Sequence, residues 1–217
     1  MSIAIQIPGV KLGQLEAAEV QVQLVHPGLA AEMDAVCERI RKTHTIEDVA
    51  LLDSVRNVRA MFRGWGVDPS RYRPSSEALL RRVVQGKGLY RISNVVDVCN
   101  LCSIETGWPF GLYDRAQLAP PITMRLGANG ESYEGIGKQT WHLAGRPVLV
   151  DARGPFGCPI SDSTRTMIRE STGALWSVIF APAAVPEEKV QAALEQYARR
   201  LESFASARNT RLSVIFS

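Results

Sequence analysis

The chain has 217 residues, of which 46% are hydrophobic and 22% charged, and its formal net charge is +3. This composition is ordinary for a globular protein with a sizeable core. The first residues lack a basic start followed by a long apolar run, so we expect no signal peptide. No apolar run approaches the roughly 20 residues that span a bilayer, and four cysteines without a secretory signal are typical of reduced thiols. We therefore expect a cytoplasmic protein that does not contact a membrane.

Positive charge is concentrated between residues 56 and 91. This window holds nine basic residues against two acidic ones, Asp68 and Glu77, which gives it a net charge of +7 and leaves −4 for the rest of the chain. A polyanion-binding face requires such a concentration, because phosphate contacts supply most non-specific affinity for nucleic acid. The alternative interpretation is a set of solvated helix faces.

The N-terminal part predicts strands followed by a helix. Residues 3–8 and 18–25 are short, alternating and β-branched, so they predict the strands of a hairpin or sheet. A helical stretch is predicted over residues 29–42. Thr45 is a candidate cap of the next helix, with Asp48 three residues later as the acid of a short capping box.

Two stripes of side chains follow helical spacing between residues 51 and 63. The first is apolar and predicts a buried face, formed by Leu51, Val55, Val58 and Phe62. The second runs beside it and carries three guanidinium groups, those of Arg56, Arg59 and Arg63. We predict one helix that packs by the first stripe and presents the second.

The remaining elements alternate irregularly. A loop over residues 64–76 precedes a helix that Ser75 or Ser76 caps and Gly86 ends. The later predictions are strands at ITMRL, RPVLVD and ALWSVIFAP, a helix from Glu187 to about Phe204, and a closing strand at LSVIFS. This order favours one α+β domain over residues 1–217, with a mixed or barrel-like sheet and packed helices, rather than a doubly wound sheet.

The segment NVVDVCNLCSIETGWPFGLYD, residues 94–114, contains a C-x-x-C pair. Zinc usually takes four ligands, and no second pair or matching histidines accompany Cys99 and Cys102. Both cysteines fall on the apolar face of a helix capped by Ser93 or Asn94, which favours buried thiols. We therefore expect neither a metal nor another cofactor.

The same helix places a short polar row beside that apolar face. Asn94, Asp97 and Asn100 follow each other at three-residue intervals. Polar groups in so apolar a segment are costly unless they are hydrogen-bonded. They therefore either tie the fold together or face a ligand.

The sequence of residues 94–114 resembles the B3/B4 domain in the β subunit of bacterial phenylalanyl-tRNA synthetase. The family carries an Asn-Val-Val-Asp-Val-x-Asn run, here Asn94 to Asn100, followed by a Gly-x-Pro-x-x-x-Φ-Asp segment, here Gly107 to Asp114. The segments at 71–84 and 154–168 are similar to freestanding members. The resemblance spans residues 55–180 and leaves residues 187–217 as an added helix and strand.

The resemblance implies hydrolysis of tRNA that carries the wrong amino acid, for example tyrosine or the arginine analogue canavanine. One departure bears on this implication: the family segment usually reads Pro-x-His-Ala-Phe-Asp, and Gly111 stands at the histidine position here. Editing by this chain therefore cannot depend on that imidazole.

Hydrolysis of an activated ester depends on positioning and on stabilisation of charge. Candidates to orient water or to hold the α-amine are Asp97, Glu77 and Asp114, and candidate donors are Asn100, Ser76, Ser163 and Thr164. Asn94 is a further candidate in the substrate site, Arg165 is a candidate for a phosphate or carbonyl, and the expected tRNA contacts are Arg56, Arg59, Arg63 and Arg81. Each has a structural alternative: Glu77 completes a first helical turn, Ser76 and Asp114 are caps, and Asp162 with Ser163 shapes a turn.

Three functions remain open from the sequence. The first is a freestanding aminoacyl-tRNA deacylase that uses no metal, with tRNA as its partner and no role for DNA. The second is a tRNA- or RNA-binding module without catalysis. The third is a protein that binds a free amino acid in the same pocket.

Overall fold

A computed structural model of the chain describes residues 1–216. The helices are α1 (Pro27–Thr43), α2 (Asp53–Gly64), α3 (Ser75–Val84), α4 (Asn94–Thr106) and α5 (Glu187–Ala205). The strands are β1 (Ile3–Ile5), β2 (Val10–Ala18), β3 (Phe110–Asp114), β4 (Ile122–Leu126), β5 (Ser132–Glu134), β6 (Thr140–His142), β7 (Pro147–Asp151), β8 (Gly154–Gly157), β9 (Ala174–Pro182) and β10 (Arg208–Phe216). Short 3-10 turns lie at Asp48–Ala50 and Arg115–Gln117.

The strands form two four-stranded sheets and one small hairpin. One sheet has the order β10-β2-β9-β3 and is antiparallel throughout, and the other has the order β1-β4-β7-β8 with a parallel β1–β4 pair. The predicted α+β class with a mixed sheet is confirmed. Within residues 1–216 both sheets are open, so the β core is not a closed barrel.

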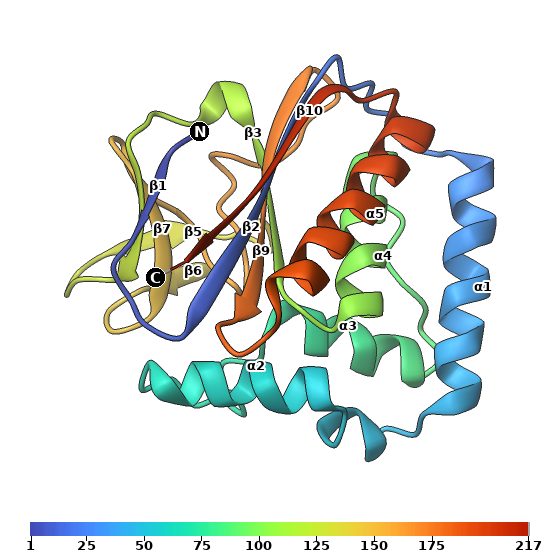
Figure 1. Cartoon of the computed structure of the whole chain (residues 1–217), viewed down its shortest axis with the longest axis horizontal. Helices are drawn as coiled ribbons and strands as arrows, with labels where there is room; N and C mark the ends of the chain where they lie inside the picture. Colours follow the sequence, from blue (N-terminus) through green and yellow to red (C-terminus); the bar gives the residue numbers. More distant parts are fainter. Residues whose placement is uncertain (217) are drawn as a thin grey trace.

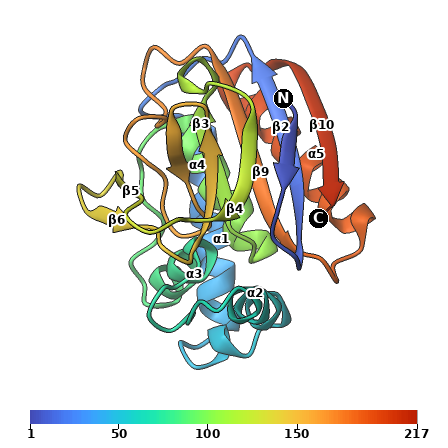
Figure 2. The same ribbon diagram turned by 90° about the vertical axis from the view of Figure 1, so that its left-hand side faces the viewer.

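Helices and sheets lie in layers (Figure 1). Helices α4 and α5 pack beside the sheet that contains β2 and β9, and the second sheet lies on the opposite side. Between the sheets, the ring of Tyr113 on β3 packs against Phe156 on β8 and Trp176 on β9, with centroids 4.9 and 5.6 Å away. Helices α2 and α3 lie together at one end of the sheets (Figure 2). No helix in this described part of the chain is long and apolar enough to cross a membrane.

The strand predicted over residues 3–8 is confirmed at Ile3–Ile5, within a sheet, but the strand predicted over residues 18–25 is wrong and the two do not form a hairpin. Residues 3–5 pair in parallel with β4, and the long N-terminal strand covers residues 10–18 instead. This strand lacks alternation because it is central in its sheet and buried on both faces. At Gly13 the helix α5 approaches so closely that a Cβ would lie 2.9 Å from Val190 Cγ1.

Most later elements are confirmed, but two of the predicted caps differ. Thr45 and Asp48 form reciprocal hydrogen bonds, with Thr45 N donating to the Asp48 carboxylate at 2.7 Å, yet they precede a 3-10 turn rather than α2. Helix α2 begins at Asp53, so Leu51 lies outside it and is exposed. Pro74 is the N-cap of α3 and no side chain caps that helix, contrary to the prediction for Ser75 or Ser76.

Candidate functional site

A buried carboxylate organises the arginines of α2 and α3. Glu77 is 1% exposed, and Arg59 donates two hydrogen bonds of 2.7 Å to its two oxygens. Arg81, one turn further along α3, donates a third bond of 2.7 Å, and Arg73 Nε lies 3.6 Å away. Arg59 lies on α2, 18 positions before Glu77, whereas Arg81 lies four positions after Glu77 on the same helix, α3. The cluster therefore fixes α2 against α3.

The charge of Glu77 is maintained by this cluster. Burial raises the pKa of its carboxyl, but the hydrogen bonds from Arg59 and Arg81 outweigh that effect and hold the pKa below its ordinary value. Glu77 is therefore an anion that positions cations. Its two oxygens accept three hydrogen bonds from Arg59 and Arg81. These two arginines, predicted to contact tRNA, are therefore paired with Glu77.

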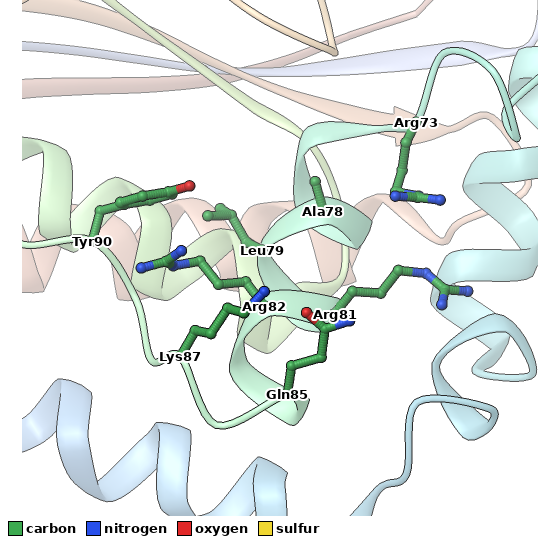
Figure 3. Close-up of a pocket in the computed structure, with 8 residues that line it drawn as sticks. All are labelled: Arg73, Ala78, Leu79, Arg81, Arg82, Gln85, Lys87 and Tyr90. Atoms are coloured by element: carbon green, nitrogen blue, oxygen red, sulfur yellow. The ribbon is translucent and has the colours of Figure 1, made fainter. Parts of the chain in front are cut away.

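The organised arginines lie between two hollows of the surface. One, of about 480 Å³, is lined on the α2 side by Arg56, Arg59 and Arg63, and it also includes Asp53. The other, of about 390 Å³, is lined on the α3 side by Arg73, Arg81, Arg82 and Lys87 together with Tyr90 (Figure 3). Arg56 and Arg63 are exposed, and within residues 1–216 the one acidic partner of Arg56 is Asp53, at 3.9 Å. We call these two hollows and the residues between them the α2–α3 surface.

The start of α4 uses its polar residues to hold the fold. The Ser93 hydroxyl caps the helix, as predicted, by accepting from Val96 N. The Asn94 side chain is buried, donates to Phe204 O at 2.7 Å and to Gln21 O at 2.9 Å, and accepts from Gln23 N at 2.8 Å. Asp97 is also buried and accepts from Ile92 N at 2.9 Å. These two members of the predicted polar row are thus committed to neighbouring segments.

Asn100, the third member of the row, differs from the other two. It lies one turn beyond Asp97, is only partly buried, and its side-chain amide makes no hydrogen bond within residues 1–216. Its amide is therefore available to a ligand. The Ser76 hydroxyl on α3 also has no hydrogen-bond partner among the described residues, but it is buried and, unlike Asn100, not accessible.

The other predicted site residues are bonded within the second half of the chain. Asp114 caps the 3-10 turn by accepting from Ala116 N, and it also accepts from the Thr172 hydroxyl at 2.8 Å. This agrees with the alternative prediction that Asp114 is a cap. Arg165 forms a two-bond ion pair with Asp151, both bonds being 3.0 Å. The Ser163 hydroxyl is buried beside that of Thr166, at 3.3 Å.

Thr164 is the last of the predicted donors. Its hydroxyl donates to Glu134 O at 3.3 Å, at the base of the β5–β6 hairpin, and its backbone amide donates to the same oxygen at 2.9 Å. Thr164 and Ser163 therefore connect the 158–166 loop to neighbouring strands, away from the Glu77 cluster.

A tyrosine and an aspartate occupy the region around Gly111. The Tyr113 hydroxyl donates to Asp162 Oδ1 at 2.7 Å, and the ring lies over both Gly111 and Gly157. Burial raises the pKa of the Asp162 carboxyl to about 7, although the bond from Tyr113 acts in the opposite direction. The charge of this carboxyl therefore changes near neutral pH.

The groups that remain uncommitted come from adjacent elements. The first residue of α3, Ser75, donates its backbone amide to Pro159 O at 3.0 Å, so Ser76 lies next to the loop that carries Asp162. Helix α3 also packs against α4, the helix that carries Asn100. The start of α3 therefore lies beside the 158–162 loop and packs against α4, and Ser76 adjoins the α2–α3 surface through its neighbour Glu77.

The four cysteines are all free thiols. Cys99, Cys102 and Cys158 are buried, and burial raises the pKa of each, that of Cys102 to about 11. No group of three or more histidine, cysteine or acidic side chains within residues 1–216 is placed to hold a metal ion.

Several residues of the site were not singled out by the sequence pattern. Arg82 and Lys87 counted only toward the basic window, Tyr90 lay between two elements, and Asp162 was read as part of a turn. Asp162 stands in a segment with other candidate site residues, but its hydrogen-bond partner Tyr113 is 49 positions away in the sequence. A long-range pair of this kind leaves no local pattern.

The comparisons with known proteins agree on one kind of domain. A family model described as the B3/4 domain matches residues 57–213. The phenylalanine–tRNA ligase beta subunit of Streptomyces avermitilis is 31% identical over 116 residues, which is 52% of this chain and 14% of that protein. The same subunit of Chromobacterium violaceum is 29% identical over 170 residues, which is 73% of this chain and 22% of that protein.

The chain therefore spans less than a quarter of the length of either relative. Among solved structures, an N-terminal fragment of the phenylalanyl-tRNA synthetase beta subunit from Pyrococcus horikoshii aligns with 97% of this chain and 51% of its own. Its identity is 14% and the TM-score is 0.48.

Proposed function

The chain belongs to the B3/4 domain family, and on this basis we propose that it is a cytoplasmic deacylase that hydrolyses mischarged aminoacyl-tRNA in trans. The observation that supports the proposal most is the junction just described, where an organised basic surface adjoins uncommitted polar groups. Arg56 and Arg63 are exposed on that surface, and guanidinium groups bind phosphate in a two-bond geometry. They would hold the tRNA while its charged end reaches the junction.

The reaction is hydrolysis of an activated ester. The oxygen of water attacks the carbonyl carbon, the bond from that carbon to the ribose oxygen breaks, and the ribose oxygen takes a proton. The products are the free amino acid and tRNA with a free hydroxyl. Such a step needs donors aimed at the developing oxyanion and a group that orients water.

We assign these roles to the groups with unused hydrogen-bonding capacity. The Asn100 amide is the proposed donor, because it is partly exposed and has no partner within residues 1–216, whereas the Ser76 hydroxyl is enclosed by the protein. Asp162 is the proposed water-orienting acid, since its raised pKa of about 7 suits proton transfer near neutral pH. Glu77 acts as a positioning residue through Arg59 and Arg81.

A binding module without catalysis is the second candidate. Gly111 removes the imidazole that the family segment usually carries, and the Tyr113 ring fills the adjacent space. In addition, Asn94, Asp97 and Arg165 have their side chains bonded inside the protein. Under this alternative the α2–α3 surface still binds tRNA, but no ester is lost.

The deciding experiment mixes the purified protein with tRNA charged separately with each of a panel of labelled amino acids, including tyrosine and canavanine. Ester loss is measured against the rate in buffer, with a parallel series in EDTA. Rapid loss for one amino acid, unchanged by EDTA, supports a deacylase without a metal and names its substrate. No loss for any member of the panel, together with tRNA binding, supports the second candidate.

A matched pair of variants tests the binding surface. The double variant Arg56→Ala/Arg63→Ala should weaken tRNA binding. The slope of log K against log salt should also become shallower, by the amount expected for about two phosphate contacts. The control Arg41→Ala/Arg199→Ala removes two exposed arginines from α1 and α5 and should bind like the wild type. Equal losses in both variants would show that binding depends on total charge alone.

A further inference from the structure

The hollow on the α3 side contains two cations that no carboxylate balances. The side chains of Arg82 and Lys87 form no ion pair or hydrogen bond within residues 1–216, whereas Arg73 and Arg81 beside them are paired with Glu77. No acidic side chain lines this hollow. Its net field is therefore positive at Arg82 and Lys87, which favours an anion there.

An aromatic platform adjoins these cations. The Arg82 guanidinium carbon lies 3.9 Å from the centroid of the Tyr90 ring, and Tyr90 is 49% exposed. Figure 3 shows Arg82 beside Tyr90, with Lys87 close to Arg82 and Leu79 near the hydroxyl end of the ring. An exposed aromatic ring held by a guanidinium plane is a surface on which a nucleobase stacks.

The donors of Arg82 are not all satisfied by the protein. Its Nε is buried and has no hydrogen-bond partner in the described part of the chain, while the side chain as a whole lines the hollow. The terminal nitrogens of Arg82 also make no hydrogen bond within residues 1–216, and a phosphate oxygen in the hollow would accept from them. The hollow, of about 390 Å³, is large enough for one nucleotide.

We propose that Arg82, Lys87 and Tyr90 form a binding site for one unpaired nucleotide of RNA, with the phosphate on the two cations and the base on the Arg82–Tyr90 platform. The proposal rests on the proposed function, because it names the part of the tRNA that this surface would take: a single-stranded end. A phosphate alone would use only the cations, and a base alone would use only the ring. The joint presence of both favours a nucleotide.

The test measures binding of a fluorescein-labelled, uncharged single-stranded RNA hexanucleotide by anisotropy at several salt concentrations. Arg82→Ala/Lys87→Ala should flatten the plot of log K against log salt by about 0.7, since the two cations share one phosphate and each phosphate contact on a single strand contributes roughly that amount. The control Lys189→Ala/Arg199→Ala removes the same charges from exposed positions on α5 and should retain the wild-type slope. Equal changes in the two variants would overturn the proposal.

Substitution of the ring separates stacking from charge. Tyr90→Ala should weaken binding roughly 5- to 150-fold, as expected for the loss of one base–aromatic contact, at an unchanged salt slope. Tyr90→Phe keeps the ring and should bind like the wild type. Failure of Tyr90→Ala to weaken binding, or equally tight binding of adenosine monophosphate, would overturn an RNA site.

This readout is independent of the proposed hydrolysis. The hexanucleotide carries no amino acid, so loss of RNA binding leaves the deacylation panel to be judged separately. Conversely, a protein that hydrolyses no ester but binds the hexanucleotide through these residues would support the nucleotide site and contradict the deacylase.

Discussion

The ring of Tyr113 occupies the space beside Gly111 that a side chain would otherwise fill. A Cβ built on Gly111 would lie 2.8 Å from Tyr113 Cζ and would overlap the hydroxyl oxygen. The ring is held there by its bond to Asp162 and by its edge-to-face contact with Phe156. In this chain, a side chain at position 111 and the Tyr113 side chain would therefore compete for the same volume.

Substitution Gly111→Ala should destabilise the protein. The added methyl group would force the fully buried Tyr113 to move, and overpacking of a core costs about 1–3 kcal/mol. Urea unfolding would measure this loss. Gly137→Ala is the matched control, since nothing lies within 4 Å of its Cβ position and its φ is not left-handed. Equal stability of the two variants would mean that Tyr113 moves without cost.

Asp162 should make the stability fall as the pH rises from about 4 to 7. Burial raises the pKa of its carboxyl from 3.8 to about 7 in the folded protein, so in this range the folded chain retains a proton that the unfolded chain has released. The free energy of unfolding of the wild type minus that of Asp162→Asn should therefore decrease with pH, by at most about 1.4 kcal/mol per unit. Urea titrations at stepped pH measure this difference. A difference that stays constant would contradict the raised pKa.

Glu77 should have the opposite dependence on pH. Its pKa is lowered in the folded state, so its contribution is present above the ordinary pKa of 4.5 and is lost as the pH falls through the lowered value. At neutral pH, Glu77→Gln should cost roughly 2–4 kcal/mol, because it leaves the Arg59 and Arg81 guanidinium groups without a counter-charge. Denaturant unfolding is the measurement. Glu47→Gln, at an exposed glutamate without an ion pair in the described residues, should change little.

Asn100→Ala should separate catalysis from binding. If its amide stabilises the oxyanion, turnover of the substrate found in the panel should fall roughly 100-fold, while tRNA affinity and the unfolding midpoint stay at wild-type values. Single-turnover ester loss and tRNA titration measure the two quantities. Asn129→Ala, at an exposed asparagine, is the control. A loss of stability in Asn100→Ala would assign the residue to the fold instead.

The thiols should react in two classes. Cys37 is the partly exposed cysteine, while Cys99, Cys102 and Cys158 are buried. Burial also raises the pKa of Cys37, so we expect one thiol to react slowly with a disulfide reagent in the native protein. Four should react after unfolding, and Cys37→Ser should abolish the native reaction. Rapid modification of two thiols would indicate that the C-x-x-C pair is accessible.

Elements with a strong local signal were predictable from the sequence. Helix α4 has a serine cap and an apolar face, and the predicted burial of Cys99 and Cys102 is confirmed. Strand β2 was missed because its burial on both faces removes the alternation that identifies a strand. Gly13 within it looks like a break, yet it is required by the approach of α5.

The site was less predictable than the fold. The basic window and the polar row on α4 were visible as composition and spacing. Which members are free depends on bonds that join distant positions, such as Asn94 with Phe204 and Arg165 with Asp151. Such pairs are decided by the tertiary structure, and no local pattern distinguishes the committed Asn94 from the uncommitted Asn100.

The position of β2 between β9 and β10 also bears on the order of folding. Leu15 pairs with Ser177, 162 positions later in the chain, and with Leu212 on its other side. Closing such long loops is slow, because their entropy is lost before the paired strands compensate for it. We therefore expect the sequence-local contacts of α3 and α4 to form early and the central sheet to assemble last. Until then the apolar β2 is an unpaired strand, and this interval is when the chain is most prone to aggregate.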